Sequence, residues 1–148
     1  MSSYRQHLYH IVFTTKHNLD TIKQDRVNEL YAYITGIIKN KNSHLYRING
    51  IENHVHILTD IHPSIASADF VRDIKASSSF WIKNTKLFPS FIGWEEGYGS
   101  FTCSYRDLNM LIEYIKNQQD HHKTVTFEDE YRRLLLEAGI TPDERYFP

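Results

Sequence analysis

The chain has 148 residues, of which 41 % are hydrophobic and 24 % are charged, and its formal net charge is −1. This length suits one domain with its own core, and the near-neutral total excludes a uniformly basic nucleic-acid binder. The single cysteine excludes an internal disulfide framework and a multi-cysteine zinc site, and no apolar run is long enough to span a bilayer. We therefore expect one cytoplasmic domain over residues 1–148.

The chain opens with a strand-like segment followed by a helix-like one. Residues 7–16, "HLYHIVFTTK", are rich in aromatic and β-branched residues and predict a strand. Residues 25–39 carry apolar residues at helical spacing and predict a helix that Asp25 could cap or open.

A hairpin and a second helix are expected next. Residues 43–50 and 51–60 predict two strands, and Asn49-Gly50 between them is a typical hairpin turn pair. Residues 64–85 then predict a helix whose apolar face is supplied by Phe70, Ile74 and Trp81.

The last third of the chain predicts one more strand and two more helices. Residues 91–104 combine three glycines with aromatic residues, which is typical of an edge strand or of a strand interrupted by a functional loop. A helix is expected from Asp107 to about residue 122. Another is expected over 126–140, opened by the capping-box pattern of Thr126 and Asp129.

This order of elements, β-α-β-β-α-β followed by helices, is the ferredoxin-like order. We therefore predict an α+β domain, a ferredoxin-like (RRM-like) antiparallel sheet with helices on one face, an added helix over 107–122 and an extra C-terminal helix and tail over 127–148. The opposite face of the sheet, or its rim, would be free to host a site.

Two histidines in "NHVHILTD" are the first candidates for such a site. In a strand, positions i and i+2 point to the same side, so His54 and His56 share one face while Val55 and Ile57 face the core. Two imidazoles are only part of a metal site. An isolated pair of this kind often has one ring packed or hydrogen-bonded and the other solvated.

The helix over 107–122 supplies two further candidates. In "EYIKNQ", Tyr114 and Gln118 are four residues apart and therefore lie on one helix face. Gln118 offers a neutral carbonyl ligand and Tyr114 a phenol oxygen. If this helix packs beside strand 51–60, His54, His56 and Gln118 make a three-ligand set. Otherwise Tyr114 is one aromatic of an amphipathic helix and Gln118 is exposed.

These motifs resemble those of a known family. "NHVHILTD" carries the His-hydrophobic-His motif of HUH endonucleases, and "EYIKNQ" resembles the catalytic helix of single-tyrosine HUH transposases. "YHIVFTTKH", "WEEGYGSFTCS" and "QQDHHKTVTFEDEYRRLLLEAGI" are also similar to this family, the last to a branch associated with repetitive palindromic DNA. The resemblance covers nearly the whole chain.

The resemblance implies a transposase that is a metal-dependent endonuclease and strand transferase on single-stranded DNA. His54, His56 and Gln118 would bind Mg²⁺ or Mn²⁺, and Tyr114 would be the nucleophile that forms a 5′-phosphotyrosine and frees a 3′-hydroxyl. Imidazole ligands favour later transition metals over Mg²⁺, so Mn²⁺ is the easier case. No residue stands out as a base for Tyr114.

The DNA itself would be single-stranded, with hairpins near the ends of the mobile DNA element that the transposase moves. Residues 1–90 carry 11 Lys and Arg against 7 Asp and Glu, whereas residues 91–148 carry 6 against 11. A local basic surface is therefore compatible with the low net charge, although such a run is often only a solvated helix face. The expected DNA-binding residues are Lys16, Arg72, Lys75, Lys83, Lys86 and Tyr98, with Tyr98 a possible base-stacking group.

The resemblance also implies a homodimer in which the tyrosine helix of one subunit completes the partner's site, although domesticated relatives can act as monomers with that helix in cis. The acidic segment 127–148 is not expected to bind DNA and could pack on the sheet or on the partner. His10 is expected to be structural or solvated, and His121 and His122 are given no catalytic role.

Three other interpretations stay open. The chain could be a ferredoxin-like nucleic-acid-binding module without catalysis, such as a domesticated transposase. It could be another HUH enzyme, a relaxase or rolling-circle initiator, although those are usually larger. It could also be a metal-dependent hydrolase that uses His54 and His56 without Tyr114.

Overall fold

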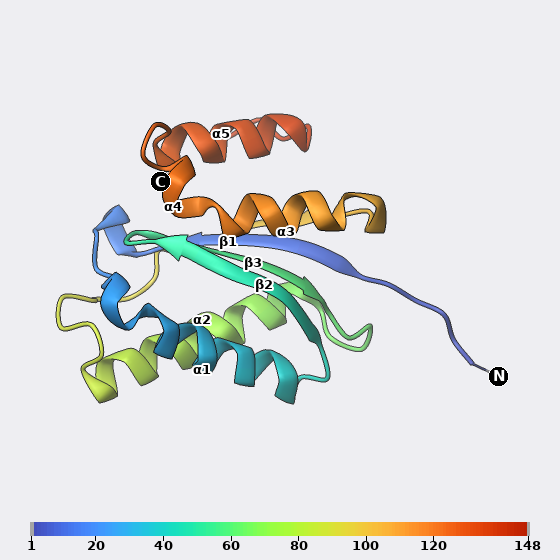
Figure 1. Ribbon diagram of the computed structural model, residues 1–148, viewed down its shortest axis with the longest axis horizontal. Helices are drawn as coiled ribbons and strands as arrows, with labels where there is room; N and C mark the ends of the chain where they lie inside the picture. The colour runs from blue at the N-terminus through green and yellow to red at the C-terminus, as the bar shows by residue number, and fades with distance from the viewer. Residues whose placement is uncertain (1, 148) are drawn as a thin grey trace.

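A single four-stranded sheet organises the protein, whose computed structural model describes residues 2–147 (Figure 1). The strands are β1 (Leu8–Thr14), β2 (His44–Ile51), β3 (His54–Asp60) and β4 (Gly99–Thr102). The helices are α1 (Val27–Asn40), α2 (Ser67–Thr85), α3 (Leu108–Lys116), α4 (Gln118–His121) and α5 (Phe127–Glu137).

The strand order confirms the predicted ferredoxin-like topology. The order across the sheet is β2-β3-β1-β4, and every neighbouring pair is antiparallel. β1 and β3 are therefore the two central strands. In their register Val12 is opposite His56 and Thr14 is opposite His54, which places both histidines in the middle of the sheet.

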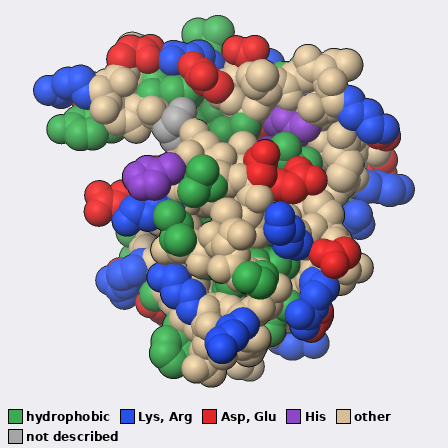
Figure 2. All heavy atoms as spheres, turned by 90° about the vertical axis from the view of Figure 1, so that its left-hand side faces the viewer, with side chains coloured by type: hydrophobic (Ala, Val, Ile, Leu, Met, Phe, Trp, Pro, Cys, Tyr) green, Lys and Arg blue, Asp and Glu red, His purple; other side chains and the backbone are tan. Residues whose placement is uncertain are grey.

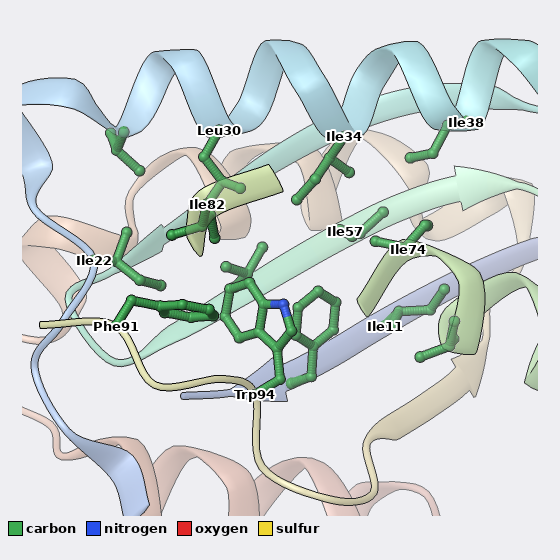
Figure 3. Packing of buried hydrophobic residues seen from close by; sticks show 14 of the residues in the cluster. Ile11, Ile22, Leu30, Ile34, Ile38, Ile57, Ile74, Ile82, Phe91 and Trp94 are labelled. Carbon is green, nitrogen blue, oxygen red and sulfur yellow. The ribbon is translucent and has the colours of Figure 1, made fainter. Parts of the chain in front are cut away.

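One face of the sheet is covered by α1 and α2, and this interface is the main core (Figure 1). Val55 and Ile57 point into it from β3, as the alternation of β3 predicts, and both are fully buried. Ile34 of α1, Phe70 and Ile74 of α2 are also fully buried. Figure 3 shows isoleucine and leucine side chains of these helices lying over the strands, with Phe91 and Trp94 packed in the same cluster.

The predicted hairpin turn at Asn49-Gly50 is wrong, because β2 continues to Ile51 and the turn falls at Glu52 and Asn53. Both residues of the supposed turn have other tasks. A Cβ on Gly50 would lie 2.0 Å from the backbone oxygen of His54, so only glycine permits this close approach. Asn49 donates hydrogen bonds to the carbonyl oxygens of Ile115 and Lys116.

The opposite face of the sheet is not bare, since α3, α4 and α5 lie over it (Figure 1). Leu108 and Ile115 of α3 pack with Leu8 and Leu58 in a small second core. The single helix expected over 107–122 is divided at Asn117, where the side-chain contacts of Asn49 hold the end of α3. The face that was expected to be free is therefore where further helices meet the sheet.

Helix boundaries elsewhere agree with the expected segments to within a few residues. Asp25 lies in a short 3₁₀ turn and gives α1 no side-chain cap. The oxygen of Thr126 does cap α5 by accepting a hydrogen bond from the backbone N–H of Asp129. Within residues 2–147 no helix is long and apolar enough to cross a membrane.

The glycine-rich segment 91–104 forms a short edge strand preceded by a shaped loop. β4 covers only Gly99–Thr102, whereas Trp94 makes an isolated bridge with Thr15. The loop is fastened to α2 because the ammonium of Lys75 donates to the carbonyl oxygens of Glu95 and Gly97, both at 2.7 Å. The positive φ of Gly97, 81°, explains why a glycine stands there.

Candidate functional site

A buried polar cluster lies between β3 and the helices on its second face. We define this polar cluster as His54, His56, Gln118, His122 and Glu130. The side chains of His54 and His56 are fully buried and point away from the main core, as their alternation with Val55 and Ile57 predicts. Gln118 is also fully buried and contacts His54, so of the two alternatives left open for helix 107–122 the structure has the one in which it packs beside this strand.

Short distances join the members of the polar cluster. The Nε2 atom of His54 lies 3.0 Å from Oε1 of Gln118, and the same oxygen lies 3.0 Å from Nε2 of His122. The Oε1 atom of Glu130 lies 3.1 Å from Nε2 of His56 and 3.0 Å from Nε2 of His122. Ligand atoms of the three histidines and Glu130 all lie within 4.8 Å of one another.

The outer nitrogen of each histidine in the cluster is already engaged. Nδ1 of His122 lies 2.7 Å from the carbonyl oxygen of Val125, which can only accept, so this nitrogen carries the proton. Nδ1 of His54 lies 2.8 Å from Oδ1 of Asn53 in the same sense. Nδ1 of His56 lies 2.8 Å from Nε2 of His10, and donation by His56 completes the pattern. This is how proteins orient imidazoles so that Nε2 faces a metal.

The consequence is a set of lone pairs that face one another. In this tautomer three Nε2 atoms, one amide oxygen and a carboxylate converge with no proton between the rings and the oxygens. Burial lowers the pKa of His54 to about 4, against an ordinary value of 6.5, so that ring is neutral at neutral pH. Five convergent acceptor groups, one of them a buried carboxylate, suit a metal cation.

Glu130 is the charged member of the polar cluster. Burial alone would raise the pKa of this carboxyl, but its contacts with the imidazoles of His122, His54 and His56 hold it far below the ordinary range. The carboxylate also receives a hydrogen bond from Nε2 of Gln118 at 2.9 Å. Glu130 is therefore ionised and satisfied, which a buried acid requires.

Tyr114 lies at the edge of the cluster and is hydrogen-bonded to it. Its hydroxyl donates to Oε2 of Glu130 and lies 3.3 Å from Nη2 of Arg133. Its ring centroid is 5.9 Å from that of His56. Burial, together with the negative charge of Glu130, raises the pKa of Tyr114 above its ordinary value of 10.0, so the phenol is protonated in this arrangement.

α5 closes the cluster from outside. The ring of Phe127 lies with its centroid 4.4 Å from that of His54, and Tyr131 stacks on Phe127 in turn. The side chain of Glu130 enters the site from the same helix. α5 therefore helps to shield His54 from solvent.

Sequence reasoning missed Glu130 and His122, and it did not pair His10, which was expected to be structural or solvated, with His56. Glu130 had one recoverable signal, because it falls between Phe127 and Leu134 on the apolar face of α5, where an acid is out of place. His122 follows Gln118 by four residues and so shares its side of the chain. Nothing in the sequence alone pairs His10 with His56, since 46 positions separate them.

The residues expected to bind DNA lie mostly together, around a groove of about 530 Å³ between α2 and residues 92–98. We call it the α2 groove, and its lining includes Lys16, Arg72, Lys75, Lys83 and Tyr98. Lys86 is exposed at the end of α2 and is not part of the lining. Figure 2 shows Lys and Arg side chains gathered around hydrophobic patches at this end of the molecule.

Two of these cations already have protein partners. The ammonium of Lys75 is bound to carbonyl oxygens of the loop, as described above. The guanidinium of Arg72 pairs with Asp69 at 3.1 Å and with Asp73 at 3.5 Å, both at exposed positions. Lys16 and Lys83 have no ion pair among the residues that the structure describes.

Known proteins resemble this chain in sequence and in fold. The family model described as "Transposase IS200 like" matches residues 3–118. A putative transposase from Deinococcus radiodurans superposes with a TM-score of 0.62 at 22 % identity, covering 80 % of this chain and 98 % of its own. A REP-associated tyrosine transposase bound to a REP hairpin superposes with a TM-score of 0.61 at 13 % identity, covering 96 % and 89 %. None of the curated protein sequences compared with the chain matches it.

Proposed function

Because the chain belongs to the family of IS200-like transposases, we propose that it nicks and rejoins single-stranded DNA through a covalent 5′-phosphotyrosine. The observation that carries the proposal is the juxtaposition of Tyr114 with the polar cluster. A phenol hydroxyl, a carboxylate and three imidazoles meet in one chain. This combination of a nucleophile and a cation site is what covalent cleavage of a phosphodiester needs.

The cofactor in this proposal is a divalent metal, Mg²⁺ or Mn²⁺. His54, His56 and Gln118 would hold it. His122 and Glu130 offer further ligand atoms, because atoms of both lie within 4.8 Å of those of His54 and His56. Oε1 of Gln118 contacts His54 and His122. When bound, the ion would stabilise the charge on the oxygens of the scissile phosphate. Three imidazoles favour Mn²⁺ over Mg²⁺.

Tyr114 is the proposed nucleophile. Its oxygen attacks the scissile phosphorus, the bond from phosphorus to the 3′-oxygen breaks, and a 5′-phosphotyrosine and a 3′-hydroxyl result. The hydroxyl already donates to the carboxylate of Glu130, so this carboxylate is in position to take the proton. The phosphotyrosine keeps the energy of the phosphodiester, and a 3′-end can later attack it without ATP.

The proposed substrate is single-stranded DNA with hairpins near the ends of the mobile DNA element. The family and the REP hairpin in a structural neighbour support this choice of partner. Lys16, Arg72, Lys83 and Lys86 would contact phosphates, and Tyr98 would contact a base. For Lys75 we now propose a supporting role, since its charge already holds the loop that forms one wall of the α2 groove.

A homodimer is part of the proposal because transposition joins two DNA ends. The groups of the site are complete within one chain, so Tyr114 need not be exchanged between subunits. Mixing His54→Ala with Tyr114→Phe tests the arrangement. Restored cleavage in the mixture means that the tyrosine helix serves the partner, and no restoration means that it acts in cis.

The deciding experiment is a denaturing gel of protein with labelled single-stranded hairpin oligonucleotides and Mn²⁺ or Mg²⁺. We expect a protein-linked DNA band that needs the metal and disappears in Tyr114→Phe. Tyr105→Phe is the matched control, because Tyr105 is close in sequence but 66 % exposed and outside the cluster. Its band should equal that of the unaltered protein.

Two other results would each select a different function. Cleavage that survives Tyr114→Phe would assign the metal-dependent hydrolase. Hairpin binding without any adduct under either metal would assign a non-catalytic nucleic-acid-binding module.

A further inference from the structure

The α2 groove has the composition of a site for a nucleotide rather than for a bare phosphate backbone. Its walls include the apolar side chains of Val71, Ala76, Ile92 and Trp94, and the aromatic ring of Tyr98. Four cations also line it, against two carboxylates, Glu95 and Glu96. An apolar, partly aromatic wall suits the flat face of a base, and the excess of cations suits the phosphates on either side.

The cations differ in what they can offer. Lys75 is occupied by the loop and Arg72 by two aspartates, whereas Lys16 and Lys83 have no ion pair among residues 2–147. Lys16 lies in the short 3₁₀ turn that follows β1 and Lys83 in the last turn of α2, so they approach the groove from different elements. The tip of the Lys83 side chain lies close to Gly93 in the groove wall.

The two carboxylates differ as well. Glu95 is engaged, because its oxygens accept hydrogen bonds from the backbone N–H groups of His17 and Glu96. The carboxylate of Glu96 is exposed and has no hydrogen bond or ion pair with any residue that the structure describes. A free carboxylate in a groove for nucleic acid repels phosphates but accepts hydrogen bonds from an exocyclic amine of a base.

The groove also connects to the neighbourhood of the polar cluster. Residues Glu95, Glu96, Gly97 and Tyr98 line a second hollow of about 360 Å³, whose other walls include Phe127, Tyr131 and Tyr146. Phe127 covers His54 directly. One loop therefore separates the α2 groove from the aromatic side chains next to the candidate site, and a single strand could cross it.

We propose that the α2 groove binds one unpaired nucleotide of the DNA, with the base against the exposed side chains of Ile92 and Tyr98 beside Trp94, the flanking phosphates on Lys16 and Lys83, and a preference for bases that present an amine to Glu96. This inference rests on the proposed function for the identity of the polymer. It adds a base-reading subsite outside the cleavage site. Cytosine and uracil separate the two parts of the idea, because they share a ring and differ in the amine or carbonyl at position 4.

Trp94 provides the readout, and the only other tryptophan can be removed. Trp81 stacks on Tyr33 with ring centroids 4.4 Å apart and does not line the groove. In a Trp81→Phe background, we would titrate homo-oligonucleotides of deoxycytidine and deoxyuridine of equal length and follow Trp94 fluorescence. Anisotropy of end-labelled DNA measures total binding in parallel. We expect quenching by both, with deoxycytidine binding at least about fivefold more tightly.

Two variants and a control assign the effect to named groups. Glu96→Ala should bring the two affinities to within about twofold, because the amine loses its acceptor. Lys83→Ala should weaken both oligonucleotides alike and lower the salt dependence by about one phosphate contact. Lys39→Ala, exposed at the end of α1 and outside the groove, should change neither quantity.

The results can overturn the inference without touching the proposed function. If anisotropy reports saturated DNA while Trp94 fluorescence is constant, the strand binds elsewhere and the groove is not its site. Equal affinity for the two oligonucleotides would remove the role of Glu96. If either negative result is found but a Tyr114–DNA adduct still forms, the proposed transposase function is retained and the groove proposal is wrong. If the base preference is found but no adduct forms, the groove proposal is retained and the proposed enzymatic function is wrong.

Discussion

The two faces of the sheet differ in almost every property except the strands they share. Toward α1 and α2 the strands present Val55, Ile57 and Ile11 to a closed apolar core. Toward α3, α4 and α5 the same strands present His54 and His56 to a buried network of polar atoms, with only a small apolar cluster beside it. The first face holds the main apolar core and the second holds the groups proposed for catalysis, and β3 contributes to both through its alternating side chains.

The largest loss of stability should come from a substitution on the apolar face of the sheet. Phe70→Ala removes a fully buried ring from the main core, and we expect unfolding to become easier by about 3–5 kcal/mol. Leu136→Ala, on the outer side of α5 and 78 % exposed, should change the free energy of unfolding by less than about 0.5 kcal/mol. Urea unfolding measures both. Equal losses would mean that the main core is not where stability resides.

Acid should weaken the protein through the polar face. Burial lowers the pKa of His54 to about 4 and that of His10 to about 3, against 6.5 for an ordinary histidine. The unfolded chain therefore binds more protons than the folded one below pH 6.5. Each ring contributes stability above pH 6.5 that is lost as the pH falls, at up to about 1.4 kcal/mol per pH unit.

Urea midpoints at pH 7, 6 and 5 check this slope. His10→Gln should flatten it, because glutamine does not titrate. Since Glu130 is depressed much further, its own protonation should add loss only at lower pH. A stability that is constant between pH 7 and 5 would contradict the buried neutral state of these rings.

A metal ion bound at the polar face should stabilise the folded protein. A cation that binds only the folded protein raises its stability by about 2.7 kcal/mol at 100 times its Kd. We expect Mn²⁺ to raise the thermal midpoint and a chelator to reverse the shift. His56→Ala should abolish the response, and His62→Ala should retain it, because His62 is bonded to Ser64 away from the cluster.

The smallest change concerns the cap of α5. Thr126→Ala removes the hydroxyl that accepts from Asp129, at a cost of about 1 kcal/mol to the helix. Because α5 contributes little to the main core, we expect faster amide exchange in α5 and nearly unchanged exchange in β1 and β3. Uniformly faster exchange would show that the two faces unfold as one unit.

The same contrast explains what could be predicted from the sequence. The main core follows from local patterns, such as the alternation around Val55 and the helical spacing of Leu30, Ile34 and Ile38, so its elements and their order could be predicted. Strand periodicity predicts that His54 and His56 share one face, and helix periodicity predicts the same for Tyr114 and Gln118, whereas only the resemblance to a known family joined the two pairs. These patterns act within one element at a time.

The remainder depends on contacts between distant segments. Asn49 and Gly50 form a good turn pair by local rules, yet long-range contacts with Ile115 and His54 use both residues inside β2. Glu130 is one of several acids in its segment, and although its place on the apolar face of α5 singles it out, only the docking of α5 brings it to the histidines. Periodicity also does not say which face of the sheet a later helix will cover.

The position of Glu130 in the chain has a consequence for biosynthesis. A ribosome makes the chain from its N-terminus, and residues 8–102 already contain every strand together with α1 and α2. The sheet can therefore pack against α1 and α2 while residues 127–137 are still inside the exit tunnel. During that interval Tyr114 lacks its carboxylate partner and His54 lacks the ring of Phe127. The nascent protein thus passes through a form whose imidazoles are open to solvent before the last helix covers them.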